Sequence, residues 1–161
     1  MPTTQPPQDT DHPLARLVAE DSPGAVLAIA PAGHPGLTAA RAAAPEADWT
    51  VLPPGTRAEE LPSHRFDLAL LIHALEPLEQ AAGEHLIARI RDLLAPALLL
   101  AMRPDARSAN ALRGLGLVHA GESDDGAVAL WTWDIATYKV TPDWLNSRYW
   151  ANPELFDVYW W

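Results

Sequence analysis

The segment that decides the fold is FDLALLI, residues 66–72. After its aspartate no polar residue interrupts it, which is typical of a strand buried on both faces of a parallel sheet. Two more short apolar runs have the same character, AVLAIA at residues 25–30 and ALLLAM at residues 97–102. Because turn-forming residues separate the runs, we expect three mutually parallel strands at the centre of one sheet.

Helical patterns lie between and around these strands. The apolar residues of the segment 84–94 form a single stripe, which predicts an amphipathic helix. The alanine-rich residues 37–44 predict a second helix, which ends before Pro45 because a residue that precedes proline disfavours the helical conformation. Shorter helices are expected at residues 13–20 and 108–115, and a single helical turn at residues 57–61.

Three further strand patterns complete the sheet: DWTVL at residues 48–52, a short pattern at 117–120 and AVALWTWDI at 127–135. The last of them alternates in the way that is typical of a half-exposed antiparallel strand. Alternating strands and helices followed by two consecutive strands predict an α/β fold. We expect a Rossmann-like, mainly parallel sheet with right-handed crossovers and an antiparallel edge.

One domain accounts for most of the chain. Residues 1–12 are polar and proline-rich, so we expect a disordered N-terminal tail. Residues 13–137 hold the strand and helix patterns and form the α/β domain, whereas residues 138–161 form an aromatic C-terminal extension. The N-terminus lacks the basic and apolar regions of a secretory signal.

The composition argues against several classes of function. The chain has 161 residues, 48% of them hydrophobic, no cysteine and a formal net charge of −10. Without cysteine there is no thiol catalysis, disulfide or cysteine-ligated metal, which fits the reducing cytoplasm. The negative charge opposes binding to nucleic acid, and no apolar run is long enough to span a membrane. We expect a cytoplasmic protein, and the abundance of Ala, Leu, Pro and Arg suggests a bacterial source.

The segments FDLALLIHALEPL, residues 66–78, and LIARIRDLLAPALLLAM, residues 86–102, carry a resemblance to a known family. They are similar to the fourth strand with its loop, and to the following helix and fifth strand, of class I S-adenosylmethionine-dependent methyltransferases. The resemblance covers about residues 22–135. It implies a methyltransferase-type sheet whose cofactor would lie beside the loop after the first strand.

The loop after the first strand departs from the pattern of that family. The family has an acidic residue and then alternating glycines, which let backbone N–H groups approach the cofactor. Here Ala28 stands in the acidic position, and Ala30 and Ala32 stand in the first glycine positions. Pro31 also removes one backbone N–H donor.

The second strand lacks the other recognition element. In the family an acid at its end binds the ribose hydroxyl groups, but here the strand ends in Leu-Pro-Pro, and no carboxylate follows until Glu59. We therefore expect no cofactor. The alternative is S-adenosylmethionine held through altered contacts, in a cleft whose candidate residues are Ala30, Gly33, Gly36 and Ile72.

Two polar residues follow the strongest strand. His73 and Glu76 lie where the carboxyl end of that strand would open onto a ligand site. His73 could act as a general base with Glu76 one turn away, or the two could simply cap a short helix. Asp67, at the opposite end of the strand, faces away from the ligand side and is expected to be structural.

Other catalytic and metal motifs are missing. We expect no metal site, because the histidines do not show the spacing of ligands on one element; they are His12, His34, His64, His73, His85 and His119. The sequence has neither the Gly-x-Ser-x-Gly elbow of a hydrolase nor a Walker sequence.

Aromatic residues gather in the C-terminal extension. Because water penalises such apolar area, we expect the extension either to fold onto its own domain or to form a subunit or partner interface. Possible anchors of a homodimer or partner contact are Trp144, Trp150, Tyr159 and Trp160. The segment TYKVTPDWLN, residues 137–146, resembles an uncharacterised bacterial family with a methyltransferase-like core and an aromatic tail.

The sequence thus leaves two functions open. The missing cofactor elements favour a methyltransferase-like domain that is non-catalytic and serves as an interaction or scaffold protein. The alternative is a diverged S-adenosylmethionine-dependent methyltransferase that acts on an unknown substrate.

Overall fold

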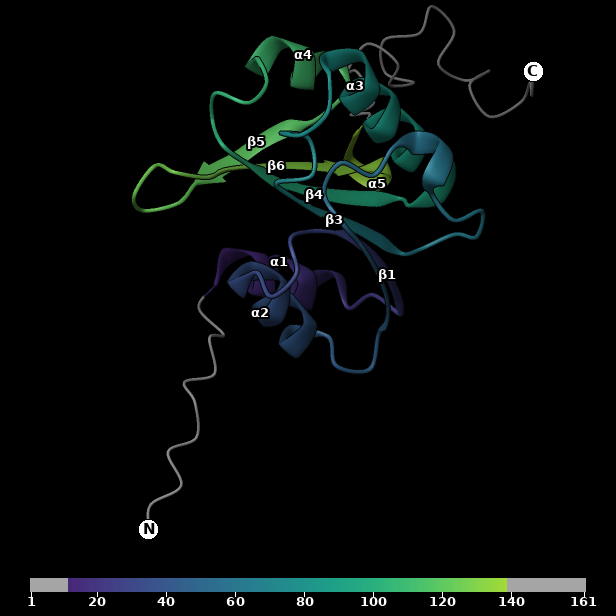
Figure 1. Ribbon diagram of the computed structural model, residues 1–161. Helices are drawn as coiled ribbons and strands as arrows, with labels where there is room; N and C mark the ends of the chain where they lie inside the picture. The colour runs from purple at the N-terminus through teal and green to yellow at the C-terminus, as the bar shows by residue number, and fades with distance from the viewer. Residues whose placement is uncertain (1–11, 139–161) are drawn as a thin grey trace, which may run out of the picture.

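A computed structural model describes residues 12–138. They form a three-layer α/β arrangement in which one sheet separates two groups of helices (Figure 1). The strands are β1 (Ala25–Ile29), β2 (Asp48–Leu52), β3 (Leu68–Ile72), β4 (Ala97–Met102), β5 (Val118–Glu122) and β6 (Ala129–Asp134). The helices are α1 (Pro13–Asp21), α2 (Pro35–Ala43), η1 (Ala58–Glu60), α3 (Gln80–Arg89), η2 (Ile90–Leu94), α4 (Ala109–Gly114) and α5 (Ile135–Tyr138).

The six strands are hydrogen-bonded in the order β2-β1-β3-β4-β6-β5. The first four are parallel, with Val26 opposite Leu68 and Ala69 opposite Leu98. Strand β6 runs antiparallel between β4 and β5. These pairings confirm the Rossmann-like fold, the parallel central strands and the antiparallel edge.

The central strands are buried on both faces because helices cover both sides of the sheet. Side chains that alternate along β3 go to two separate cores: Leu70 packs on the α1/α2 side, whereas Leu71 packs on the α3 side. Every residue of β3 is buried. Each buried leucine contributes about 2 kcal/mol of transfer free energy, which is why this apolar run fixes the centre of the domain.

Asp67 has the structural role that its place in the sequence predicts. Its Oδ2 accepts hydrogen bonds from the backbone N–H groups of Gly24 and Ala25, each at 2.9 Å. The carboxylate therefore joins the start of β1 to the start of β3, at the edge of the sheet opposite the carboxyl ends of the strands.

Two helices differ from the sequence-based expectation. Helix α2 begins at Pro35 rather than Leu37, because the side chain of His34 caps it and proline is favourable at the first helical position. Helix α3 begins earlier than expected, at Gln80, and its C-terminal part changes to the π-helical segment η2.

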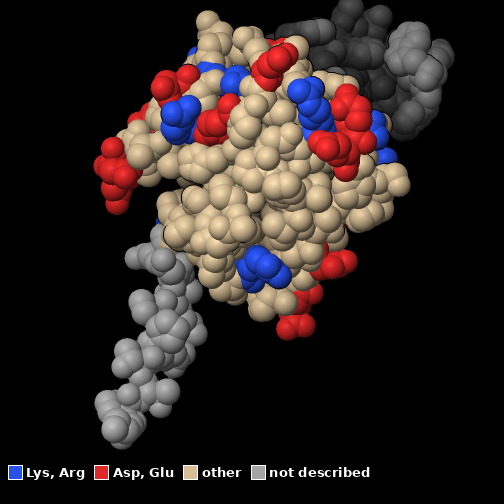
Figure 2. Space-filling view, viewed as in Figure 1, with Lys and Arg blue, Asp and Glu red and all other residues tan. Residues whose placement is uncertain are grey.

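The surface carries charges of both signs. On the face shown in Figure 2, acidic and basic groups are interspersed over its upper part, and the middle is largely uncharged. Between residues 12 and 138, no helix is long and apolar enough to cross a membrane.

Candidate functional site

The candidate site lies where the chain order of the sheet reverses. From β1 the chain continues to β2 on one side, whereas β3 pairs with the other side of β1. Loops that leave the carboxyl ends of β1 and β3 diverge at such a point and form the crevice in which open α/β sheets bind ligands. The loops after Ile29 and Ile72 hold most of the site residues that the sequence predicts.

The crevice contains a cavity of ≈ 100 Å³. Apolar side chains of β3, β4 and β6 line one part of it, and the beginning of α1 lines another. The lining residues include Leu14, Ile72, Ala101, Leu130 and three histidines, His12, His34 and His73.

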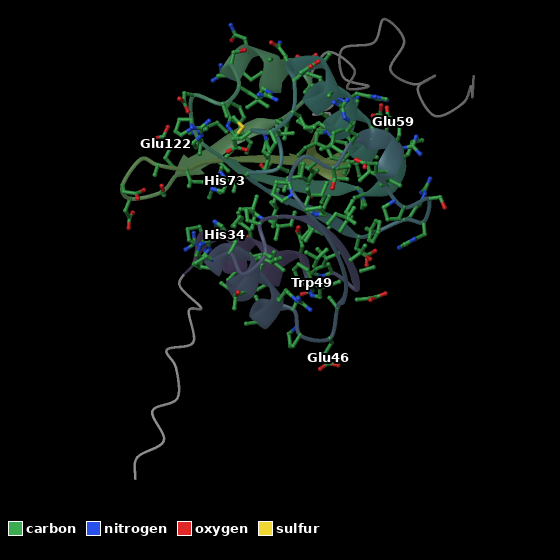
Figure 3. The ribbon with its side chains drawn as sticks, in the orientation of Figure 1. His34, Glu46, Trp49, Glu59, His73 and Glu122 are labelled. Carbon is green, nitrogen blue, oxygen red and sulfur yellow. The ribbon has the colours of Figure 1, made fainter. Side chains whose placement is uncertain are left out.

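His73 has an unusual backbone conformation. Its φ of 50° lies in the left-handed region, which costs a residue with a side chain about 1 kcal/mol or more. Its backbone N–H is held by the carbonyl group of Ala101 at 2.8 Å. This conformation carries the imidazole out of the strand and into the crevice, beside the ring of His34, with 5.6 Å between the ring centroids (Figure 3).

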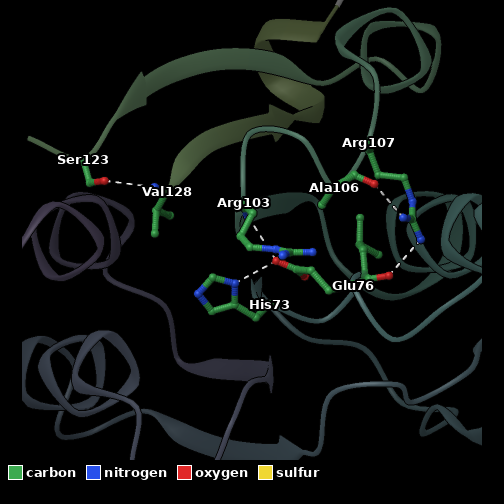
Figure 4. Close-up of polar contacts among 8 residues, drawn as sticks. His73, Glu76, Arg103, Ala106, Arg107, Ser123 and Val128 are labelled. Atoms are coloured by element: carbon green, nitrogen blue, oxygen red, sulfur yellow. Dashed lines mark hydrogen bonds and ion pairs between the residues drawn. The ribbon is translucent and has the colours of Figure 1, made fainter. Parts of the chain in front are cut away.

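Glu76 orients the imidazole of His73. Its Oε1 lies 2.7 Å from Nδ1 of His73 and also accepts a hydrogen bond from the backbone N–H of Arg103 at 3.1 Å (Figure 4). Because an ionised carboxylate only accepts, Nδ1 of His73 carries the proton and Nε2 keeps its lone pair when the ring is neutral. The structure thus brings together the two residues that the sequence singled out, in the geometry of an oriented general base.

Arg107 fixes the loop that carries this pair. Its guanidinium group donates to the carbonyl groups of Leu75 at 2.8 Å and Leu78 at 2.6 Å. The guanidinium group lies so close to Gly83 of α3 that a Cβ added to this glycine would be 3.1 Å from Nη2 of Arg107. The loop after β3 is therefore held on both sides, by Arg107 and by the Glu76–Arg103 contact.

The other two histidines of the crevice cap helices. Nδ1 of His34 accepts the N–H of Gly36 at 3.0 Å, and Nδ1 of His12 accepts the N–H of Leu14 at 3.2 Å. Burial lowers the pKa of His34, and the neighbouring His73 and His12 lower this pKa further. Sequence reasoning missed these caps, although the repeated dipeptide His-Pro at both helix starts was a usable signal.

Of the candidate cofactor residues, Ile72 lines the cavity, and most of the four offer no open surface. Ala30 and Ile72 are almost completely buried, with exposed fractions of 2% and 1%. Gly36 packs closely against Leu14 and the ring of His12, whereas Gly33, at φ 70°, faces open space. Ala28, in the position of the family's acid, is fully buried in the core on the α1/α2 side.

A metal site finds no support among residues 12–138, where no three His, Asp or Glu side chains are grouped to hold an ion. His12 and His34 use the lone pairs of Nδ1 to accept amide protons, so their neutral rings carry hydrogen on Nε2 and cannot ligate through it. The proposed interface anchors Trp144, Trp150, Tyr159 and Trp160 lie outside the described residues.

A family model matches residues 8–161, almost the whole sequence. The chain belongs to the DUF6231 family. The description of DUF6231 is a family of unknown function, so membership alone assigns no activity. No curated protein sequence matches the chain.

Three solved structures, two of them methyltransferases, share the fold of this DUF6231 member. The pyocyanin biosynthetic protein PhzM aligns with a TM-score of 0.53 and 16% identity over 76% of this chain and 54% of its own. Magnesium protoporphyrin IX methyltransferase from Synechocystis PCC 6803, with bound SAM, aligns with a TM-score of 0.51 and 14% identity. The alignment covers 78% of this chain and 77% of the methyltransferase. Human N-acetylserotonin methyltransferase, in complex with SAM, aligns with a TM-score of 0.51 and 12% identity. The alignment covers 79% of this chain and 53% of the human enzyme.

The DUF6231 chain spans about half the length of PhzM and of the human enzyme. At such low identities the likeness shows the fold alone. It confirms the expected methyltransferase-like core of the domain, and the family description agrees with the expectation of an uncharacterised family.

Proposed function

We propose that this DUF6231 domain is a non-catalytic, methyltransferase-like interaction domain that does not bind S-adenosylmethionine. The size of the crevice carries this proposal. A cavity of ≈ 100 Å³ is well below the range of about 300–1,000 Å³ that ligand pockets of this kind occupy. The crevice is small because the start of α1 lies over it and Leu14 packs against Gly36.

The chemistry of the crevice supports the same proposal. A bound ribose and a charged amino acid group need carboxylates and open backbone amides. The positions that would provide them hold Ala28 and Ala30, both buried among apolar side chains. The N–H of Ala30 is already bonded to the carbonyl group of Leu52 at 3.0 Å. This amide is therefore not free to donate to a ligand.

Calorimetric titration with S-adenosylmethionine and S-adenosylhomocysteine tests the proposal. We expect no heat of binding at about 50 μM protein, whereas an isotherm with a Kd near about 10 μM, roughly −7 kcal/mol, would overturn it. The methyltransferase from Synechocystis, which was solved with bound SAM, serves as the positive control. Thermal unfolding of the same samples with and without ligand provides an independent readout.

The second candidate function is a diverged methyltransferase, and one observation favours it. His73 is held in a strained conformation, and Glu76 orients its ring into the crevice, which is how a general base is prepared. Transfer of a labelled methyl group to any substrate, lost in His73→Ala and reduced in Glu76→Gln, would establish this function instead.

A further inference from the structure

Helices α1 and α2 begin in the same way at the mouth of the crevice. In each, a histidine stands at the N-cap, a proline follows at the first helical position, and Nδ1 of the histidine accepts the amide proton two residues along the chain. Nδ1 can accept only when it carries no proton. Protonation of the ring turns this acceptor into a donor that faces another donor, so each cap exists only with a neutral histidine.

The surroundings of His34 oppose a positive charge on its ring. The ring stands at the positive end of α2, and its burial lowers its pKa, as do the nearby His73 and His12. Apolar residues of β3, β4 and β6 lie beside it, and among residues 12–138 no Asp, Glu, Lys or Arg lines the cavity.

The acidic groups nearest to the crevice are engaged with other partners. Oε1 of Glu76, in the loop after β3, accepts from His73 and from the backbone of Arg103, whereas no described residue is bonded to its buried Oε2. From the turn between β5 and β6, Ser123 lines the cavity, but its hydroxyl group donates to Asp125 at 2.6 Å. Glu122, at the end of β5, lies 3.9 Å from His119. These pairings leave a proton on His34 or His12 without a carboxylate bonded to it in the described crevice.

We propose that the first turns of α1 and α2 form a proton-operated cover of the crevice, which is closed while His12 and His34 are neutral and opens when they become protonated. Opening is local, because Val18, which lies beyond the first turn, keeps the rest of α1 packed in the core that it shares with α2 and the sheet. It exposes the apolar floor at Ile72, Ala101 and Leu130 and enlarges the cavity. This inference is independent of whether the crevice binds a cofactor.

The sign of the pH dependence follows from the direction of the pKa shift. The pKa of His34 is lower in the folded protein than the ordinary value of 6.5. The cap is therefore fully present above pH 6.5, and its contribution is lost as the pH falls below 6.5 through the lowered pKa of the folded state. The cover should be closed at neutral pH and open in mildly acidic solution.

Amide hydrogen exchange of the full chain, corrected for intrinsic rates, tests the proposal. Between about pH 7.5 and about pH 5.5 we expect the first turns of both helices to lose protection by roughly fivefold per cap. The double variant His12→Asn/His34→Asn keeps an uncharged side-chain acceptor at each N-cap and should show no such loss. His85→Asn, which replaces an exposed imidazole on α3, is the control and should behave like the unchanged protein.

Equal pH-dependent loss in the double variant and the unchanged protein would overturn the proposal, as would constant protection in the unchanged protein. If the double variant does not fold, the unchanged protein still decides the question. The NMR titration of the His34 ring must then have the same midpoint, below 6.5, as the loss of protection at Gly36 and Thr38, whose amides are bonded to His34. Different midpoints would refute the proton-operated cover.

Discussion

Asp67 ties the start of β1 to the start of β3, and its replacement by alanine should weaken the whole sheet. The change removes two hydrogen bonds of 2.9 Å, from the N–H groups of Gly24 and Ala25 to one carboxylate oxygen. A hydrogen bond to a charged group contributes about 1.5–3 kcal/mol when it is shielded from water. Because Asp67 is exposed, we discount each bond to about 1 kcal/mol and expect a total loss of about 2 kcal/mol.

Thermal and urea unfolding measure this loss. For a chain of 161 residues, about 2 kcal/mol corresponds to a fall in Tm of roughly 4–8 °C. Asp67→Asn keeps an acceptor oxygen and should lose less than Asp67→Ala. Asp105→Ala, at an exposed position after β4, is the matched control and should change Tm little. If Asp67→Ala and Asp105→Ala unfold at the same temperature, the carboxylate does not stabilise the sheet and the reasoning fails.

Two further predictions concern the loop after β3 and the C-terminal extension. Arg107→Met keeps the apolar stem of the side chain but removes the hydrogen bonds to the carbonyl groups of Leu75 and Leu78, of which Leu75 keeps the N–H of Leu78 as a donor. Urea unfolding should therefore show a loss of about 1–2 kcal/mol. Arg65→Met, at an exposed position before β3, is the control, and equal stability of the two variants would argue against the role of Arg107. Deletion of residues 142–161 should lower Tm without changing the number of subunits if the extension packs on its own domain. If the extension joins two subunits, light scattering should show that the deletion turns a dimer into a monomer. A truncated chain with an unchanged Tm and an unchanged number of subunits would show that the aromatic residues contribute neither to the stability of the domain nor to a subunit contact.

The sequence predicts the central strands well because their apolar character is local and continuous. The run that becomes β3 could only be buried on both faces, and the same holds for β1 and β4. Boundaries at helix starts were less predictable. Helix α2 begins two residues before its expected start, because a histidine side chain completes the cap, and histidine is not among the preferred N-cap residues.

The candidate site was predictable only in part. His73 and Glu76 are three residues apart, so their contact could be inferred from spacing within one loop. His12 and His34 approach His73 only because the sheet places the starts of two helices at the carboxyl ends of its strands. Sequence reasoning considered these histidines as metal ligands. It could not see that their Nδ1 atoms accept backbone amide protons, because that depends on the capped helix ends.

The last strand of the sheet bears on how copies of this chain meet in solution. Strand β5 is largely exposed and stands at the end of the strand order, and such an edge can pair with a strand from another molecule. Its pairing with β6 is irregular between His119 and Gly121. A strand from a second copy could therefore follow β5 in regular register for only a short distance on either side of that break. Irregularities of this kind disfavour edge-to-edge aggregation.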